Sequence, residues 1–209
     1  MTPTSPVVVK LGGSLLMLPD LADRLRSVMQ HLRDQKFLLV VGGGAAADEI
    51  RRLNERYGLT PTQAHWNAIA AMSFNTAVVS RVLGHLPVVS DQLEAQAVWE
   101  DHQVVLVEPT VFLHKLNTKN TQHLPESWSV TSDSIAAFIA LHWPSQQLLF
   151  CKSCDLLSHS TEEVCDAGLL DEWLSELLPS LRKADVQISW LNLRADHYSL
   201  QPMRSSGGR

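Results

Sequence analysis

The chain has 209 residues, 45% of them hydrophobic and 19% charged, which is typical of one packed globular domain. A formal net charge of -5 argues against a general nucleic-acid or anionic-membrane binder, because such proteins usually carry a basic excess or patch. The odd number of cysteines, three, argues against a disulfide framework.

The first half of the chain alternates short apolar runs with helical patterns. Two β-branched runs that end in glycines predict buried strands over residues 7–11 and 37–41. Apolar residues at helical spacing predict a helix over residues 20–33. We also expect a helix over residues 45–57 that stops at Gly58, and a long helix over residues 60–83 that starts at the Thr60-Pro61 pair.

The second half of the chain continues this alternation. The stretch over residues 109–128 is polar and irregular, and it predicts a long loop. Elsewhere in this half we expect strands over residues 87–89, 104–107, 147–152 and 186–190, and helices over residues 91–100, 132–143 and 169–181.

Strands that alternate with helices indicate βαβ units, and therefore an α/β domain with a largely parallel sheet and helices on both faces. Ligands bind such sheets at the carboxyl ends of the strands, so the loops directly after strands are the candidate functional segments. We expect a single domain over residues 1–203 and a disordered polar tail over residues 204–209. With no signal-peptide pattern and no run of about 18 apolar residues, we expect a cytoplasmic protein that does not span a membrane.

Glycine-rich turns follow the first two predicted strands. The first is Lys10-Leu11-Gly12-Gly13-Ser14, and the second, Val41-Gly42-Gly43-Gly44-Ala45, leads directly into a helix. Glycine lets the backbone approach a ligand closely, and free N–H groups at a helix start favour an anion. Neither turn matches the P-loop or the dinucleotide fingerprint. Tight turns without a ligand are one alternative, but the pair of turns together with Lys10 favours phosphate binding.

This pattern resembles the amino acid kinase family, which includes acetylglutamate, aspartate, carbamate, uridylate and isopentenyl phosphate kinases. The resemblance rests on the two glycine turns and on Val130-Thr131-Ser132-Asp133-Ser134-Ile135-Ala136, and it runs from Val7 to about Leu193. It implies a three-layer αβα sandwich around a mainly parallel sheet. It also implies transfer of the γ-phosphoryl group of ATP to a carboxylate, a carbamate or a phosphate, and a homo-oligomer, since many relatives pair through helices.

The resemblance implies where the substrates bind. ATP phosphates would bind at Gly12, Gly13 and Ser14, and the acceptor end would bind at Gly42, Gly43, Gly44 and Ser132. Mg²⁺ would bridge the ATP oxygens and keep several waters, so that few protein ligands are required.

The resemblance also implies three residues at the transferred phosphoryl group. Lys10 would stabilise its charge, and Lys152, at the end of a predicted strand, would do so from the far side. Asp133 would orient these lysines rather than act as a base. Capping of the helix that starts there is the plain alternative, and the two roles of Asp133 are compatible.

Two further segments resemble the branch of the family that serves methanofuran biosynthesis and phosphorylates an aminomethylfuran-methyl phosphate to its diphosphate. They are Ala64-His65-Trp66-Asn67-Ala68-Ile69-Ala70-Ala71-Met72 and Leu124-Pro125-Glu126-Ser127-Trp128-Ser129-Val130-Thr131-Ser132-Asp133. In such an acceptor pocket, His65 would contact a phosphate and Trp66 would stack on a furan ring. Alternatively, both are ordinary residues at the start of an apolar helix. Trp128 either packs its loop or closes over a ring.

The sequence departs from the family pattern after the strand predicted over residues 147–152. Relatives carry a segment resembling T-D-V-D-G-V-Y near the nucleotide, and here the glycine is missing and Asp155 matches an aspartate of that segment. Two alternatives to a phosphate-acceptor kinase stay open. One is a carboxylate kinase of the acetylglutamate or aspartate type, and the other is a non-catalytic nucleotide-binding or regulatory subunit.

Two cysteines of this region, Cys151 and Cys154, form a C-x-x-C pair with His159 and Cys165 nearby. The spacing is also compatible with a zinc site or a thioredoxin-like redox pair. A free cysteine inside a buried strand is the commoner arrangement, and we favour it.

Overall fold

The computed structural model describes residues 5–32, 35–119, 123–197 and 199–204. Of the tail predicted over residues 204–209, Arg204 alone belongs to these described residues. Its N–H donates to the His159 carbonyl at 2.6 Å, and its carbonyl accepts from the Thr161 N–H at 2.9 Å. The positions after Arg204 lie outside the described residues.

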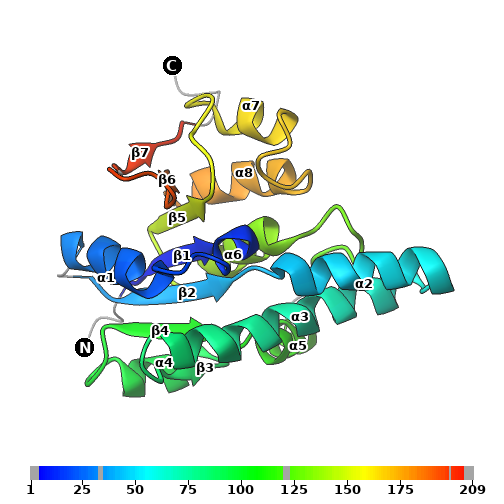
Figure 1. The fold of residues 1–209 in the computed structure, drawn as a ribbon, viewed down its shortest axis with the longest axis horizontal. Coiled ribbons are helices and arrows are strands. Elements are labelled where there is room, and N and C mark those ends of the chain that lie inside the picture. The colour runs from blue at the N-terminus through cyan, green and yellow to red at the C-terminus, as the bar shows by residue number, and fades with distance from the viewer. Residues whose placement is uncertain (1–4, 33–34, 120–122, 198, 205–209) are drawn as a thin grey trace.

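A seven-stranded sheet forms the middle layer of the domain, in the order β3-β4-β2-β1-β5-β6-β7 (Figure 1). All neighbouring strands pair in parallel except β6 and β7, which are antiparallel. The strands are β1 (Val7–Leu11), β2 (Phe37–Val41), β3 (Val88–Val89), β4 (Val104–Val107), β5 (Gln147–Lys152), β6 (Gln187–Asn192) and β7 (Gln201–Pro202).

Helices cover both faces of this sheet, which confirms the predicted three-layer α/β architecture. Within the described residues, no helix is long and apolar enough to cross a membrane. The helices are η1 (Gly13–Leu15), α1 (Leu21–His31), α2 (Gly44–Tyr57), α3 (Pro61–Val82), α4 (Gln92–Val98), α5 (Pro109–Lys119), α6 (Ser132–His142), α7 (Thr161–Asp166) and α8 (Leu174–Lys183).

The alternation of side chains along β1 divides the core between the two faces. Val7, Val9 and Leu11 belong to the core beneath α1, whereas Val8 belongs to the core beneath α5, α6 and α8. Because successive side chains of a strand point to opposite faces, Lys10 points to the same face as Val8. The strand period therefore sends the one charged side chain of β1 toward α6.

The long loop predicted over residues 109–128 is wrong for its first half, which is the helix α5. The Glu108 carboxylate accepts a 2.6 Å hydrogen bond from the Val111 N–H, and Pro109 occupies the first helical position. Phe112 is buried and stacks on Trp143, with ring centroids 5.5 Å apart. The Glu108-Pro109 pair is typical of a helix start and could have predicted α5. The polar residues further along the helix led to the loop prediction instead.

The helix predicted over residues 169–181 begins later in the structure, and a short helix precedes it. Ser160 starts α7 by accepting a 3.3 Å hydrogen bond from the Glu163 N–H. Residues 169–173 were predicted as helix, but they belong to a segment over residues 167–173 that connects α7 to α8 without helical structure and is anchored by the buried Leu170.

Candidate active site

The two glycine turns meet at the carboxyl edge of the sheet. β1 pairs with β2 on one side and with β5 on the other, so the segments that follow these three strands are neighbours. The Gly42 N–H donates to the Leu11 carbonyl at 2.9 Å, and the Gly12 N–H donates to the Cys151 carbonyl at 2.9 Å. The parallel sheet therefore brings together turns that are about 30 residues apart in sequence.

Backbone packing explains several of these glycines without any ligand. A Cβ atom on Gly13 would lie 2.2 Å from the Gly44 nitrogen, and a Cβ atom on Gly42 would lie 2.8 Å from the Gly13 nitrogen. Gly44 also has a φ of 48°, which side chains rarely adopt. The turns touch each other directly, and this contact places the start of α2, with its unsatisfied N–H groups, beside the first turn.

Lys10, Asp133 and Lys152 form a buried cluster directly beside these turns. The Lys10 Nζ atom lies 2.7 Å from Asp133 Oδ1, and the Lys152 Nζ atom lies 2.8 Å from Asp133 Oδ2. The exposed fractions of the three side chains are 5%, 7% and 13% for Lys10, Asp133 and Lys152. The structure thus brings together all three residues predicted to act at the transferred phosphoryl group, from β1, α6 and β5.

Electrostatics keep the Asp133 carboxyl group ionised. Burial alone raises its pKa, but the ammonium groups of Lys10 and Lys152 outweigh burial and hold the pKa below its ordinary value. Burial lowers the pKa of Lys152, and the nearby charge of Lys10 lowers it further, against the opposite effect of Asp133. Two cations facing one carboxylate leave a surplus of positive charge, which suits a bound anion. Asp133 acts as their counter-ion, and its low pKa makes it unsuitable as a general base.

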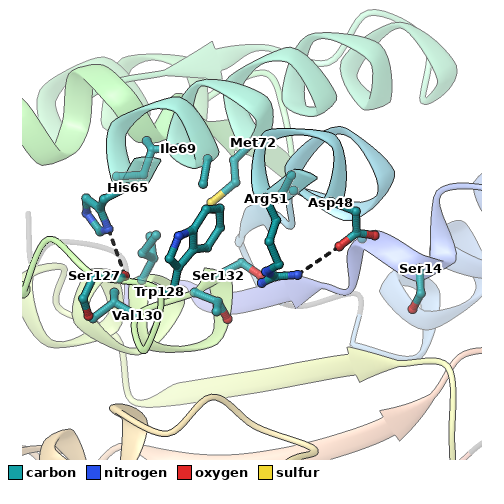
Figure 2. Close-up of a pocket in the computed structure, with 17 residues that line it drawn as sticks. Ser14, Asp48, Arg51, His65, Ile69, Met72, Ser127, Trp128, Val130 and Ser132 are labelled. Carbon is teal, nitrogen blue, oxygen red and sulfur yellow. Dashed lines mark hydrogen bonds and ion pairs between the residues drawn. The ribbon is translucent and has the colours of Figure 1, made fainter. Parts of the chain in front are cut away.

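A cavity of about 230 Å³ opens between α2, α3 and the segment before α6 (Figure 2). Ser14 lies at one end of it and His65 at the other, and Gly13, Gly43 and Gly44 also line it. Apolar side chains line much of the cavity, among them Ala68, Ile69, Met72, Val130 and Ile135. The cavity therefore joins residues of the glycine turns to apolar walls and has the size of a small molecule.

The two residues predicted to contact the acceptor have different surroundings. His65 lines the cavity, and its Nδ1 atom lies 3.4 Å from the Ser127 carbonyl. Burial lowers the pKa of His65, so its imidazole is neutral at neutral pH. The Trp66 indole is not among the groups that line the cavity. It donates to the Glu126 carboxylate at 2.9 Å and stacks on His114 at 4.0 Å.

Trp128 and Arg51 line the cavity in which the sequence predicted Trp66. The Arg51 guanidinium lies 4.8 Å from the centre of the Trp128 ring, and both side chains line the cavity (Figure 2). Arg51 also donates to the Asp48 carboxylate at 3.2 Å. Arg51 is the one lysine or arginine among the described residues that line this cavity. The buried Nε1 atom of Trp128 has no hydrogen-bond partner within the part of the chain that the structure describes.

The loop after β5 contacts the first glycine turn. The Ser14 hydroxyl donates to the Ser153 hydroxyl at 3.0 Å, and Arg194 donates to the Ser14 carbonyl at 3.2 Å. Asp155, predicted to lie near the nucleotide, is exposed and accepts a 2.8 Å hydrogen bond from Asn192 at the end of β6. The structure thus places a serine pair and an arginine around the turn predicted for ATP, with Asp155 further along the same loop.

The two cysteines of the C-x-x-C pair have different surroundings. Cys151 is buried in β5, with burial raising its pKa to about 12, whereas Cys154 is exposed. Over residues 5–32, 35–119, 123–197 and 199–204, no group of three or more His, Cys, Asp or Glu side chains is placed to hold a metal ion. Cys151 behaves as a core residue, as its strand position predicted.

Sequence reasoning did not single out Arg51, Arg194 or Asp171 as site residues. Arg51 lies two turns into α2, and Arg194 follows the last long strand, so neither is near a motif in sequence. Asp171 accepts hydrogen bonds from the Thr131 and Ser134 N–H groups at the start of α6. The N-cap residue of α6 makes no capping hydrogen bond through its own side chain, which would have indicated a cap from elsewhere in the chain. That missing bond is visible only in the structure.

Comparison with known proteins identifies the family of this arrangement. Residues 5–174 match the model of the amino acid kinase family. The chain is also 25% identical, over 134 residues, to the [5-(aminomethyl)furan-3-yl]methyl phosphate kinase of Methanocaldococcus jannaschii. That match covers 63% of this chain and 58% of the relative's length.

Solved structures share the fold at low sequence identity. The UMP kinase of Ureaplasma parvum superposes with a TM-score of 0.64 at 15% identity, covering 95% of this chain and 99% of that one. The uridylate kinase of Archaeoglobus fulgidus superposes with a TM-score of 0.59 at 16% identity, covering 96% and 91%. The aspartate kinase of Synechocystis gives 0.59 at 14% identity, covering 97% of this chain and 41% of that one.

Replacing Asp133 tests the energetics of the buried cluster. Asp133→Asn leaves two buried cations without a counter-ion and should lower the free energy of unfolding by roughly 3–5 kcal/mol near neutral pH. The folded-state pKa of Asp133 is lowered, so its stabilising effect is complete above the unfolded pKa of about 3.9 and is lost as the pH falls further. In urea titrations from pH 6 downward, the difference between wild type and variant should therefore shrink only below that value.

The exposed Asp155 provides the control, since Asp155→Asn removes a carboxylate without unpairing a buried cation. We expect it to change stability little. An Asp133→Asn variant as stable as Asp155→Asn would contradict the electrostatic role of the cluster.

Proposed function

Because the chain belongs to the amino acid kinase family, we propose that it is a phosphotransferase that moves the γ-phosphoryl group of ATP to a small phosphate-ester acceptor. The observation that carries this proposal is the cluster of Lys10, Asp133 and Lys152, adjoining two glycine turns and a cavity. The name of the Methanocaldococcus jannaschii relative gives an aminomethylfuran-methyl phosphate as its substrate, which supports an acceptor of this type. The product is then a diphosphate, as needed for a methanofuran-like C1 carrier.

ATP binds, in this proposal, at the turn of Gly12, Gly13 and Ser14. Arg194 reaches this turn from the far edge of the site and supplies a further cation for the ATP phosphates. Mg²⁺ would enter this site together with ATP and would require few protein ligands. When bound, the ion neutralises part of the phosphate charge.

The transfer needs positioning and charge stabilisation more than acid–base chemistry. An oxygen of the acceptor phosphate attacks the γ-phosphorus, a new P–O bond forms, and the bond to the β-phosphate oxygen breaks with its electron pair, releasing ADP. A phosphate monoester is largely ionised at neutral pH, so the attacking oxygen requires no general base. Lys10 and Lys152 stabilise the charge on the group in transit, and Asp133 holds the two lysines in place.

The acceptor occupies the cavity of Figure 2, with its phosphate at the second glycine turn and Ser132. Arg51 contacts this phosphate, and the adjoining Trp128 ring stacks on the acceptor. The neutral His65 provides a hydrogen-bonding group at the far end of the cavity. A charged end beside Arg51 and an apolar middle fit a small ring that carries a phosphate.

A homo-oligomer also belongs to this proposal. Phe74, Val78 and Val82 lie at successive four-residue intervals on α3 and are 63%, 45% and 49% exposed. Four-residue spacing places them on one helical stripe, and exposed apolar stripes of this kind suit burial against another protein surface. A second copy of the chain is the partner that fits a family of oligomeric kinases.

The first test is acceptor-dependent ADP release from Mg-ATP, with phosphate-ester and carboxylate acceptors and with hydroxylamine to trap any acyl phosphate. We expect release with an aminomethylfuran-methyl phosphate and no trapped product. Lys10→Met should lower kcat by roughly 100- to 1000-fold, because it removes a cation at the transferred group. The exposed Lys183 provides the control, and Lys183→Met should leave kcat unchanged. A trapped hydroxamate would show that the acceptor is a carboxylate and not a phosphate ester. Absence of both ADP release and ATP binding would favour a non-catalytic subunit.

Arg51→Met tests the acceptor side. Loss of a charged hydrogen-bond donor should raise the KM for the phosphate acceptor roughly 10- to 100-fold while the KM for ATP stays the same. The next residue is the matched control: Arg52 pairs with Glu49 and does not line the cavity, so Arg52→Met should leave both constants unchanged. Equal acceptor KM values for the two variants would show that Arg51 does not contact the acceptor.

Light scattering coupled to size exclusion tests the oligomer. We expect a mass of at least twice 23.2 kDa for the wild type. Phe74→Glu should lower it toward the monomer, because a charge on the stripe opposes its burial. Leu93→Glu changes another exposed apolar residue, on α4, and should leave the mass unaltered. A monomeric wild type would exclude this part of the proposal.

A further inference from the structure

The segment that joins α7 to α8, residues 167–173, contacts the buried cluster and the start of α6 together. The Lys152 Nζ atom donates to the Leu169 carbonyl at 2.7 Å, so this lysine is held from two sides, by Asp133 and by the segment. The Trp173 N–H donates to the Ser129 carbonyl at 3.3 Å, in the chain that leads to α6. The side chain of Leu170 is 2% exposed and anchors the segment in the core.

Asp171 supplies the cap that α6 lacks in its own sequence. Thr131 is the N-cap residue, yet its side chain accepts no hydrogen bond from the helix. Instead, Asp171 Oδ2 accepts from the Thr131 N–H at 2.9 Å, from the Thr131 hydroxyl at 2.8 Å and from the Ser134 N–H at 2.8 Å. The Ser134 hydroxyl donates to Asp171 Oδ1, which also accepts from the Leu174 N–H at 3.2 Å. One carboxylate thus ties the first turn of α6 to the beginning of α8.

The capped turn contains Asp133, which stands between Thr131 and Ser134. Asp133 is the second residue of α6, so its position follows that of the first turn. Both of its oxygens are used by lysines on different strands, which leaves little freedom for the carboxylate. A shift of this turn would change the distances to Lys10 and Lys152 together, and it would also move Ser132 at the cavity wall.

We propose that Asp171 is a positioning residue for phosphoryl transfer, which fixes Asp133 and Lys152 in their productive arrangement through the first turn of α6. This inference rests on the proposed kinase function. Asp171 itself touches neither the cavity nor the turns that hold the phosphates, so it acts through the residues that it holds. Misplacement of reacting groups by about 1 Å is enough to cost a reaction on the order of 100-fold in rate.

The charge of Asp171 matters as well as its shape. Asparagine has the same size but presents an NH₂ donor in place of one carboxylate oxygen, where the carboxylate accepts from donors of Thr131 and Ser134. Asp171→Asn therefore removes the negative charge and the hydrogen bonds made by that oxygen. Lys152 is surrounded by Lys10, Asp133 and Asp171, and the Asp171 carboxylate raises the pKa of Lys152 against burial. Loss of this charge should therefore move any alkaline limb of the kcat profile that reports Lys152 toward lower pH.

The experiment compares Asp171→Asn with Glu172→Gln, which removes an exposed carboxylate at the adjacent position. We expect Asp171→Asn to lower kcat roughly 10- to 100-fold, with the KM for ATP within about threefold of wild type and the alkaline limb shifted to lower pH. Glu172→Gln should leave all three unchanged. Asp171→Glu, which retains the charge, should restore part of kcat.

Ser134→Ala provides a second route should Asp171→Asn fail to fold, because it removes one donor to the carboxylate from the α6 side. It should lower kcat in the same direction by a smaller factor. Wild-type values of kcat for Asp171→Asn, or for Ser134→Ala where Asp171→Asn does not fold, would overturn the inference and leave the kinase proposal standing.

A wild-type protein without turnover would instead contradict the proposed function. A crystal structure of Asp171→Asn, or of Ser134→Ala if that variant alone folds, then decides the positioning role. Displacement of the first turn of α6 and of the Lys152–Asp133 pair supports it, and an unmoved turn with both ion pairs intact overturns it.

Discussion

The buried contact of one carboxylate with two lysines is the constraint on which the rest of the site depends. Burying charges is costly, and it succeeds only where partners are close and well oriented. Here the partners come from β1, β5 and α6, so the central strands and the helix above them must keep one mutual position. The same arrangement leaves a surplus of positive charge at the edge of the sheet where the loops are open to ligands.

The glycine turns impose a second constraint, which is steric. Gly13 packs on Gly44 so closely that neither position tolerates a side chain, and this contact aligns the start of α2 with the turn after β1. Packing therefore requires glycine at these positions, as the proposed phosphate binding also does. The fold alone explains part of the glycine content of these turns. The buried lysines beside them are the feature that indicates binding of an anion.

The two substrates in our proposal meet at the junction of two parts of the chain. The hairpin of α2 and α3 extends beyond the ends of β1 and β2 (Figure 1). Its residues line one part of the proposed acceptor cavity, and the segment before α6 lines another. The loops after β5 and β6 surround the opposite turn through Ser153 and Arg194. α6 and the segment over residues 167–173 connect these parts, which is why Asp171 can influence the chemistry without contacting a substrate.

The sequence by itself determined most of the alternation of strands and helices, because strand period and glycine-rich turns are local properties. Its resemblance to the amino acid kinase family gave Lys10, Asp133 and Lys152 as candidates. The bounds of β1, β2, β4 and β5 agree with those predicted. Only the tertiary structure decided that Trp128 rather than Trp66 lines the cavity and that Arg51 brings a positive charge to its wall. It also decided that Asp171 caps α6 from about 40 residues away. Side-chain direction and contacts between distant segments depend on how helices pack, and no local pattern encodes them.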